Sequence, residues 1–361
     1  MAPYVLKPAP EPYNPKPPSA DGDVVFRFNR LFYERRSSQK KGYRFRVEQF
    51  PGFSTSADEV PLLNSALVDA KPNIDLLDGY TEDAEQMRFD RNSLLLHSFQ
   101  LAMINFNGGA KAIEDNGGLG RKELYECEFM CTRASLVHIG LKFFDARLTL
   151  GLVAVQRSGV IFLHEITMDG PSEFAVQDEY VGHRFRQLMT NPEDKVPKSV
   201  TSFEDEHFGI QRLNFRKMRI LCRSVVDCVT DEESYKYVEL KTHREKTAGQ
   251  FNISPLKSVR WWLQMKFTGV DDLVVGSRDY NNVLRKTQYA KSETFLSPDF
   301  NKNAVLMFTE DCLTKIQLHM NDVDEGIPRL FLSPAGDINL YLKVTDIDHQ
   351  MFHPDFEQLL R

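Results

Sequence analysis

Segments with the periodicity of strands and of helices alternate along the chain beyond residue 25, and this alternation restricts the possible folds most strongly. Residues 213–230 and 235–242 have the apolar pattern of strands, whereas 177–190 and 255–268 have apolar residues at helical spacing. We find no internal repeat and no linker in this region. Interleaved segments of this kind predict a single α/β domain in which mixed β-sheets are flanked by helices.

The same alternation runs through the remaining segments. Residues 84–105 have helical spacing, and Asn107-Gly108-Gly109 predicts the end of that helix. Residues 128–167 predict three consecutive strands, with a hairpin turn at Arg157-Ser158-Gly159 before the third. The three strand-like stretches are EFMCTRASLVHIGL, LTLGLVAVQ and GVIFLHEITM, and LVVGSRDY, AVLMF and LFLSPAGDINLYLKV complete the chain.

The N-terminal segment differs from the rest in composition. Seven of its first eighteen residues are prolines, which favour extended polyproline conformation and cannot build a core. We predict a disordered Pro-rich arm over residues 1–22 and a folded domain over residues 23–361; a docking segment for a partner is the alternative for the arm. The segment lacks the apolar stretch of a secretory signal, and no apolar run in the chain is long enough to predict a membrane span.

The charge balance limits how the protein meets nucleic acid. The chain has 45 basic and 51 acidic residues, a net charge of −6, so any nucleic-acid contact must rest on a local patch. Residues 24–50 are basic and rich in aromatic residues, which is typical either of a solvated face or of a nucleic-acid contact. The basic residues there are Arg27, Arg30, Arg35, Arg36, Lys40, Lys41, Arg44 and Arg46.

The cysteines indicate a reducing compartment. There are five, too few and too scattered for a disulfide framework, and none has a His or Cys partner at zinc-finger spacing. We predict free thiols at Cys127, Cys131, Cys222, Cys228 and Cys312.

Three charged residues on consecutive strand-like segments carry the chemical information. Asp227 lies at the end of one segment, and Glu239 and Lys241 lie two apart on the next. Residues i and i+2 of a strand share a face, so Glu239 and Lys241 point the same way and Asp227 on a neighbouring strand meets them. The pattern is typical of metal-dependent phosphodiester cleavage, in which carboxylates hold Mg²⁺ or Mn²⁺ and the lysine assists the attacking water. Solvated surface charges are the alternative.

The order and context of several short segments make the chain similar to the DXO family of RNA 5′-end decapping and exonuclease proteins over most of its length. The resemblance implies a DXO-like nuclease fold for residues 23–361 and places Arg133 in the family's arginine motif. The matching segments, in chain order, are IDLLDGY (74–80), MCTRASLVHI (130–139), LTLGLVAVQRSGVIFLHEI, YVGHRFR (180–186), SVVDCV (224–229), YVELKT (237–242), WWLQ (261–264) and VVGSRD (274–279).

Two departures from the family pattern affect the site. Arg186 and Val225 stand where the resemblance places glutamates, whereas Asp227, Glu239 and Lys241 are kept. Together these five positions carry no net charge, and a divalent cation needs several anionic oxygens to replace its hydration shell. We therefore predict a degenerate site, a pseudoenzyme without bound metal or other cofactor.

The guanidinium of Arg186 is expected to occupy the metal position. A guanidinium can donate two parallel hydrogen bonds to carboxylate oxygens, so Arg186 is predicted to bridge Asp227 and Glu239. Arg186 in solvent, with its helix shifted by a turn, is the alternative. The resemblance also implies that Arg133, Lys241 and Gln264 contact the RNA 5′ end. Arg186 would add a further cation that can bind phosphate. The alternative is that these residues are kept only for structural reasons and bind no RNA.

The degenerate pattern is similar to that of a family member in the insect germline piRNA pathway. The resemblance implies a nuclear protein that assembles with the adaptor Deadlock and the chromodomain protein Rhino, shields uncapped RNA 5′ ends and opposes transcription termination. Two rival functions stay open. One is a residual metal-dependent decapping enzyme or 5′–3′ exonuclease that uses Asp227 and Glu239, and the other is a protein scaffold whose RNA cleft is vestigial.

Overall fold

A computed structural model describes most of the folded part of the chain. The predicted arm at residues 1–22 lies outside the described residues, so the division into arm and domain stays a prediction. The described residues are 24–39, 43–50, 53–54, 60–81, 91–120, 124–166, 173–191, 196–197, 199–200, 207–230, 236–245, 252–344 and 351–360.

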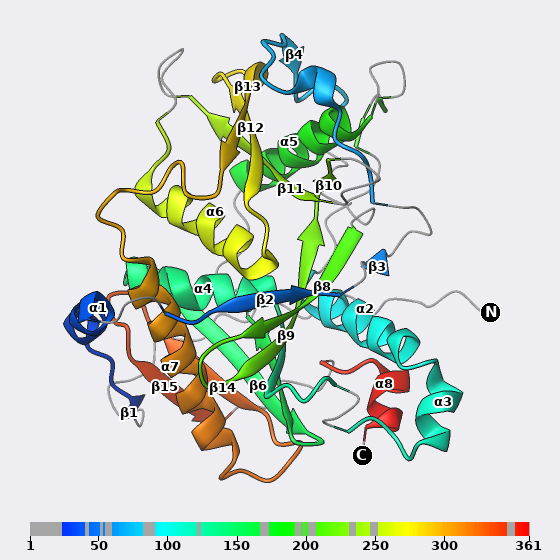
Figure 1. The fold of residues 1–361 in the computed structure, drawn as a ribbon, viewed down its shortest axis with the longest axis vertical. Helices are drawn as coiled ribbons and strands as arrows, with labels where there is room; N and C mark the ends of the chain where they lie inside the picture. The colour runs from blue at the N-terminus through cyan, green and yellow to red at the C-terminus, as the bar shows by residue number, and fades with distance from the viewer. Residues whose placement is uncertain are drawn as a thin grey trace.

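Two mixed β-sheets form the framework, as the alternating pattern predicts (Figure 1). Within the described residues the larger sheet has ten strands in the order β1-β15-β14-β6-β7-β5-β9-β8-β2, with β3 also paired to β8. Strand β5 runs parallel to β7 and β9, and the other pairs are antiparallel. The strands are β1 (Val24–Phe26), β2 (Arg46–Gln49), β3 (Phe53–Ser54), β5 (Phe129–Thr132), β6 (Leu150–Arg157), β7 (Val160–Glu165), β8 (His207–Asn214), β9 (Arg219–Val226), β14 (Arg329–Ser333) and β15 (Leu340–Val344).

The smaller sheet continues directly from the larger one. Its order is β10-β11-β12-β13-β4, with β11 and β12 parallel and the other pairs antiparallel. One residue, Asp227, separates the end of β9 in the large sheet from the start of β10 in the small one. The strands are β4 (Ile74–Asp75), β10 (Cys228–Val229), β11 (Tyr237–Arg244), β12 (Asp272–Arg278) and β13 (Val283–Lys291).

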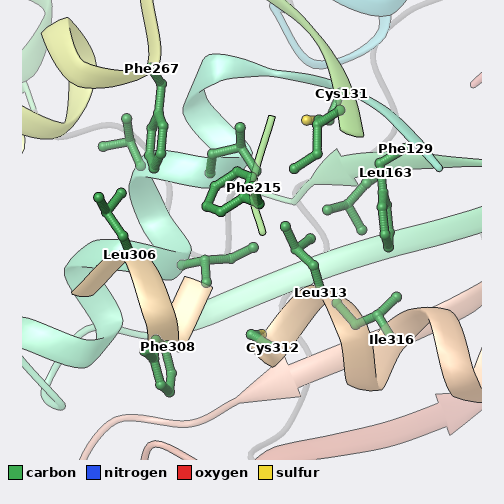
Figure 2. Packing of buried hydrophobic residues seen from close by; sticks show 14 of the residues in the cluster. Phe129, Cys131, Leu163, Phe215, Phe267, Leu306, Phe308, Cys312, Leu313 and Ile316 are labelled. Atoms are coloured by element: carbon green, nitrogen blue, oxygen red, sulfur yellow. The ribbon is translucent and has the colours of Figure 1, made fainter. Parts of the chain in front are cut away.

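Helices cover both sheets. In the large sheet, Phe129 and Cys131 of β5 join the core under α4, α6 and α7, whereas Met130 points into the core under α2, α3 and α8. Figure 2 shows the first of these cores, in which residues of α7 such as Leu313 and Ile316 lie opposite Leu163 of β7. The helices are α1 (Arg30–Gln39), α2 (Arg91–Phe106), α3 (Ala110–Asp115), α4 (Arg133–Phe144), α5 (Glu173–Thr190), α6 (Pro255–Thr268), α7 (Lys302–Met320), α8 (Pro354–Leu359) and the 3₁₀ turn η1 (Ser65–Leu67).

Helix α6 fixes the small sheet relative to the large core. Trp262 and Phe267 of α6 pack in the core of the large sheet, whereas Trp261 and Met265 pack on the small sheet. Helix α5 covers the opposite face of the small sheet, where Phe185 packs against apolar residues of β11 and β12. The small sheet is therefore held between α5 and α6 (Figure 1). No helix in the described ranges is long and apolar enough to cross a membrane.

Several elements agree with the sequence analysis. Helix α6 spans the residues predicted for it, and α5 contains the predicted helix at 177–190. The hairpin turn between β6 and β7 is confirmed, because Ser158 and Gly159 both have positive φ angles of 50° and 69°, as a two-residue turn of this hand requires. All five cysteines are free and buried, as predicted.

Other predictions were wrong, and each has a physical cause. The strand predicted from residue 128 ends at Thr132, and the following residues form α4. Since Ser135 to Phe143 are nearly all buried, α4 shows no polar stripe, and a helix buried on all sides cannot be told from a strand by periodicity. AVLMF, for which the sequence analysis gives no element type, lies in the similarly buried α7. The stretch 213–230 contains the end of β8, all of β9 and the short β10, and LFLSPAGDINLYLKV divides between the paired strands β14 and β15.

The contact between α5 and β12 depends on a residue without a side chain. A Cβ on Gly276 would lie 2.6 Å from Phe185 Cε2 and 2.8 Å from Leu284 Cδ1. We expect Gly276→Ala to lower the free energy of unfolding by about 2 kcal/mol, because both groups are buried and must shift. Chemical denaturation measures the change.

A matched glycine in α5 serves as the control. A Cβ on Gly182 would meet nothing within 4 Å, so Gly182→Ala is expected to stabilise the helix by about 0.5–1 kcal/mol. Equal stability of wild type and Gly276→Ala would show that α5 is not held by this close approach.

Candidate nucleic-acid interface

The site forms where the chain crosses from the large sheet to the small one. Strands β5 and β9 are parallel, so Arg133, which directly follows β5, and Asp227, which directly follows β9, lie at the same edge of the large sheet. Cys228 pairs with Val238 in the antiparallel β10–β11 ladder, which brings Asp227 alongside Glu239 and Leu240. The topology therefore gathers three sequence-predicted residues at one point.

Asp227 is buried and held from two sides. The backbone N–H of Leu240 donates to its Oδ2 at 2.8 Å, and Arg186 Nη2 of α5 lies 3.0 Å from its Oδ1. Its side chain is only 6% exposed. Burial raises the pKa of Asp227 above its ordinary value, and the guanidinium of Arg186 opposes this rise by stabilising the charged form.

Glu239 is equally buried but has two cationic partners. Arg133 Nη1 donates to Oε2 at 3.2 Å and to Oε1 at 3.3 Å, and Lys241 Nζ donates to Oε1 at 2.6 Å. Burial alone would raise the pKa of Glu239; Arg133 and Lys241 outweigh it and lower the pKa to about 2. Glu239 is therefore ionised at neutral pH and neutralised within the protein.

A second group of charges lies where α5, β11, β12 and α6 meet. Arg278 Nη2 lies 2.5 Å from Asp178 Oδ1, and Arg244 Nη2 lies 3.4 Å from the same oxygen. Lys257 of α6 donates to the backbone oxygen of Thr242 at 3.0 Å. Burial, reinforced by the positive charge of Arg278, lowers the pKa of Lys257 to about 8, although Asp178 acts against this.

Both groups border one cleft of about 350 Å³. Five cationic and three carboxylate side chains line it, so the wall is net positive in a protein that is acidic overall. The lining residues are Arg133, Asp178, Glu179, Gly182, His183, Phe185, Arg186, Val225, Asp227, Leu240, Lys241, Thr242, Lys257 and Arg278.

The donor set at the cleft does not fit a divalent cation. Mg²⁺ and Mn²⁺ need several free anionic oxygens, but the carboxylates of Asp227 and Glu239 are already bound by arginine and lysine. Val225 contributes no oxygen from its side chain. Across the described ranges, no group of three or more His, Cys, Asp and Glu side chains is placed to hold a metal ion.

The structure places most sequence-predicted residues together. Arg133, Arg186, Val225 and Lys241 line the cleft with Asp227, and Glu239 is paired with two of them. The predicted contact of Arg186 with Asp227 is present, and Glu239 forms ion pairs with Arg133 and Lys241; a bridge from Arg186 to both carboxylates stays a prediction. The roles of these residues in binding RNA stay predictions.

Gln264 of α6 differs from most of the other predicted residues in its relation to the cleft. It is not among the described residues that line the cleft, and its Oε1 is buried without a hydrogen-bond partner. It sits seven residues beyond Lys257 on α6, which is two turns, or about 10 Å, along the same helix face. The predicted contact of Gln264 with the RNA 5′ end stays a prediction.

Sequence reasoning missed the second group of charges. Arg278 belongs to the VVGSRD segment that carries part of the family resemblance, but nothing marked its side chain as facing the site. Lys257 and Asp178 had no signal at all in the sequence beyond a helical position.

Comparison with solved structures identifies the fold class. Rai1 of Schizosaccharomyces pombe in complex with 3′-FADP matches with a TM-score of 0.62 at 18% identity, over 85% of this chain and 96% of the other. Rai1 of Scheffersomyces stipitis in complex with (3′-NADP)⁺ and calcium matches with a TM-score of 0.67 at 15% identity, over 88% and 96%. The mixed α/β fold is therefore the fold of the Rai1 nucleases.

Sequence comparison identifies the family. A family model described as RAI1 like PD-(D/E)XK nuclease matches residues 48–356, and the chain therefore belongs to the RAI1/DXO family. The decapping nuclease dom-3 of Caenorhabditis elegans is 28% identical over 183 residues, 45% of this chain and 46% of the relative. Rai1 of Drosophila melanogaster, a decapping and exoribonuclease protein, is 26% identical over 206 residues, 50% and 52%. The chain spans about half the length of these relatives in the matched segments.

The pair of Arg186 and Asp227 makes a testable electrostatic prediction. Arg186→Gln leaves Asp227 buried without its counterion, and we expect this to destabilise the protein by about 3 kcal/mol at neutral pH. In the folded variant the pKa of Asp227 rises further above its value in the unfolded chain. The loss of stability therefore becomes smaller as the pH falls, by at most about 1.4 kcal/mol per pH unit. It disappears near pH 4, where Asp227 is also protonated in the unfolded chain. Denaturation curves at pH 7.5 and pH 5 measure it.

Two further variants serve as controls. Arg186→Gln/Asp227→Asn removes both charges and is expected to recover most of the loss at neutral pH. Arg147→Gln removes an arginine that is 86% exposed and paired with Asp145, and is expected to change stability by less than about 1 kcal/mol. A pH-independent loss in Arg186→Gln would contradict the proposed charge compensation.

Proposed function

We propose that this member of the RAI1/DXO family binds and shields uncapped RNA 5′ ends without hydrolysing them. The observation that carries the proposal is the 3.0 Å contact between Arg186 and Asp227. By the family resemblance, Asp227 is a carboxylate of the metal site and Arg186 stands in the place of a metal-binding glutamate. A guanidinium at this point neutralises the carboxylate, and it is fixed to the protein and provides no water for attack.

The charges of the cleft support binding of a phosphate chain. Phosphate contacts dominate nucleic-acid affinity, and a net positive cleft in an acidic protein concentrates the attraction in one place. Relatives of this fold were solved with such ligands, Candida albicans Rai1 with pU5 and Mn²⁺ and Schizosaccharomyces pombe Rai1 with 3′-FADP. We extend the ligand class, but not the metal, to this chain.

The combination of a kept cleft and lost carboxylates most resembles Cutoff, the catalytically degenerate family member of the insect germline. On this basis we propose a nuclear protein that acts at piRNA source loci with Deadlock and Rhino and suppresses transcription termination there. Co-purification of both partners with the tagged full chain from germline nuclei tests the assembly. Recovery of neither partner contradicts it.

One observation favours a residual enzyme as the second candidate. Asp227 and Glu239 remain side by side, and Lys241, the lysine of the cleavage motif, lies next to them with its Nζ 2.6 Å from Glu239 Oε1. Displacement of Arg186 by a metal ion would regenerate part of a catalytic site. A scaffold with a vestigial cleft is disfavoured by the five cations that line it.

We expect the purified protein neither to remove caps nor to degrade 5′-phosphorylated RNA at millimolar Mg²⁺ or Mn²⁺. Its site lacks the free carboxylates that two-metal or one-metal hydrolysis uses. Gel analysis of capped and 5′-phosphate substrates measures turnover. Metal-dependent hydrolysis that disappears in Asp227→Ala would establish the residual enzyme in place of the proposed function.

A gain-of-function variant gives the matched control. Val225→Glu/Arg186→Glu restores the two glutamates that the family resemblance places here, and both positions line the cleft. We expect Mn²⁺ binding to appear by calorimetry in the double variant and to stay absent in Arg186→Gln, which adds no carboxylate. Equal Mn²⁺ affinity of wild type and double variant would contradict the account.

The third functional prediction concerns RNA affinity. Arg133→Gln/Lys241→Gln/Glu239→Gln removes two cations together with the carboxylate that they neutralise, so no buried charge is left unpaired. We expect weaker binding of 5′-phosphorylated single-stranded RNA and a slope of log K against log salt that is flatter by about 1.4, the value for two lost phosphate contacts. Lys111→Gln on α3 is the control. Unchanged affinity and slope in the triple variant would place the RNA elsewhere.

A further inference from the structure

Of the five cations that line the cleft, four have a carboxylate partner, and the fifth has none among the residues that the structure describes. Arg133 and Lys241 are paired with Glu239, Arg186 with Asp227, and Arg278 with Asp178. In the part of the chain that the structure describes, no carboxylate lies within ion-pair distance of the fifth, whose side chain is half-buried in α6. The fifth cation is Lys257.

The contacts of Lys257 leave part of its hydrogen-bonding capacity unused. Within the described residues, its Nζ donates one hydrogen bond, to the backbone oxygen of Thr242 at 3.0 Å, and lies 5.1 Å from the centroid of the Trp261 ring. An ammonium group has three N–H donors, and a partly buried cation that lacks an anionic partner is unfavourable. The positive charges of Arg278, Lys241 and Arg244 add to this cost, as the lowered pKa of Lys257 reflects.

We propose that Lys257, together with Arg278, forms an anion subsite for a phosphate group, at the border of α6 and β12 and separate from the contacts at Asp227 and Glu239. The proposal refines the function proposed above and rests on it in one respect, that the phosphate belongs to a bound RNA strand. A phosphate would accept hydrogen bonds from the remaining N–H groups of Lys257 and would supply the negative charge that balances this lysine.

The surroundings of Lys257 favour an anion over other ligands. A metal cation would be repelled by the lysine and arginines, and an apolar group would leave the ammonium uncompensated. Asp178 already has both Arg278 and Arg244 as partners. A phosphate can therefore bind Lys257 without breaking an existing ion pair of that side chain, which is not so at Arg133, Arg186 or Lys241.

The subsite also predicts a pH dependence. Below about pH 8 Lys257 is charged and attracts phosphate; above it the lysine becomes neutral, so affinity falls as the pH rises from 7 to 9. Burial lowers the pKa of His243 below its ordinary value, so that side chain does not change charge in this range. The charged and titratable groups that border Lys257 are Asp178, Glu179 and His183 from α5, Lys241, His243 and Arg244 from β11, and Arg278 from β12.

Competitive acetylation of the whole chain, with each lysine quantified by peptide mass spectrometry, tests the subsite. Labelling is followed against pH for the free protein and in the presence of inorganic phosphate, 5′-phosphorylated RNA and 5′-hydroxyl RNA. We expect Lys257 to react with a midpoint near pH 8 and to be protected by ligand, whereas the exposed Lys111 on α3 is expected to show no protection by ligand. Protection by 5′-phosphorylated RNA alone assigns the subsite to the terminal phosphate, and protection by both RNAs assigns it to an internucleotide phosphate.

Binding assays on variants complete the test. Lys257→Gln is expected to bind 5′-phosphorylated RNA more weakly at pH 7, with no further loss at pH 9, whereas the wild type loses about tenfold between pH 7 and pH 9. Lys257→Arg keeps the charge and is expected to bind at both pH values.

The outcomes separate the subsite from the proposed function. RNA that binds without protecting Lys257, and with equal affinity in Lys257→Gln, overturns the subsite and leaves the function standing. Protection of Lys257 by inorganic phosphate in a protein that binds no RNA supports the subsite and overturns the function. If Lys257 is not protected by any ligand and the protein binds no RNA, both the subsite and the proposed function are overturned.

Discussion

Asp227 and Glu239 are two carboxylates buried next to each other, and the rest of the site depends on how their charges are compensated. In a metal-dependent nuclease the compensation comes from a divalent ion. Here Arg186 compensates Asp227, and Arg133 with Lys241 compensates Glu239. The protein itself therefore supplies positive charge for both carboxylates, and on this basis we propose that the fold keeps them without a metal ion.

This compensation requires the elements around it to be held closely. Arg186 reaches Asp227 only because α5 lies tightly on the small sheet, where Gly276 leaves room for the ring of Phe185. Asp227 itself sits on the single residue between β9 and β10, so its position is fixed by both sheets. The same cations that neutralise the carboxylates line the cleft, and a phosphate must share them or use Lys257, which lacks a carboxylate partner among the described residues.

The sequence predicted which charged residues meet at the site better than it predicted their partners. Asp227, Glu239 and Lys241 were found because strand periodicity and segment order are local properties, and the turn at Ser158 and Gly159 was found for the same reason. Helix α4 was mistaken for a strand because burial on all sides removes its polar stripe. The partners of Glu239 and the charges at Lys257 depend on packing between distant elements, which a pattern along one segment does not contain.

The central claim is that a fixed guanidinium stands where the family's metal ion would bind. Anomalous diffraction from crystals soaked in millimolar Mn²⁺ tests it most directly, because it locates the ion and the arginine in the same experiment. The account predicts no Mn²⁺ peak between Asp227 and Glu239, with Arg186 still in contact with Asp227. A peak at that position, with Arg186 displaced from Asp227, would contradict it.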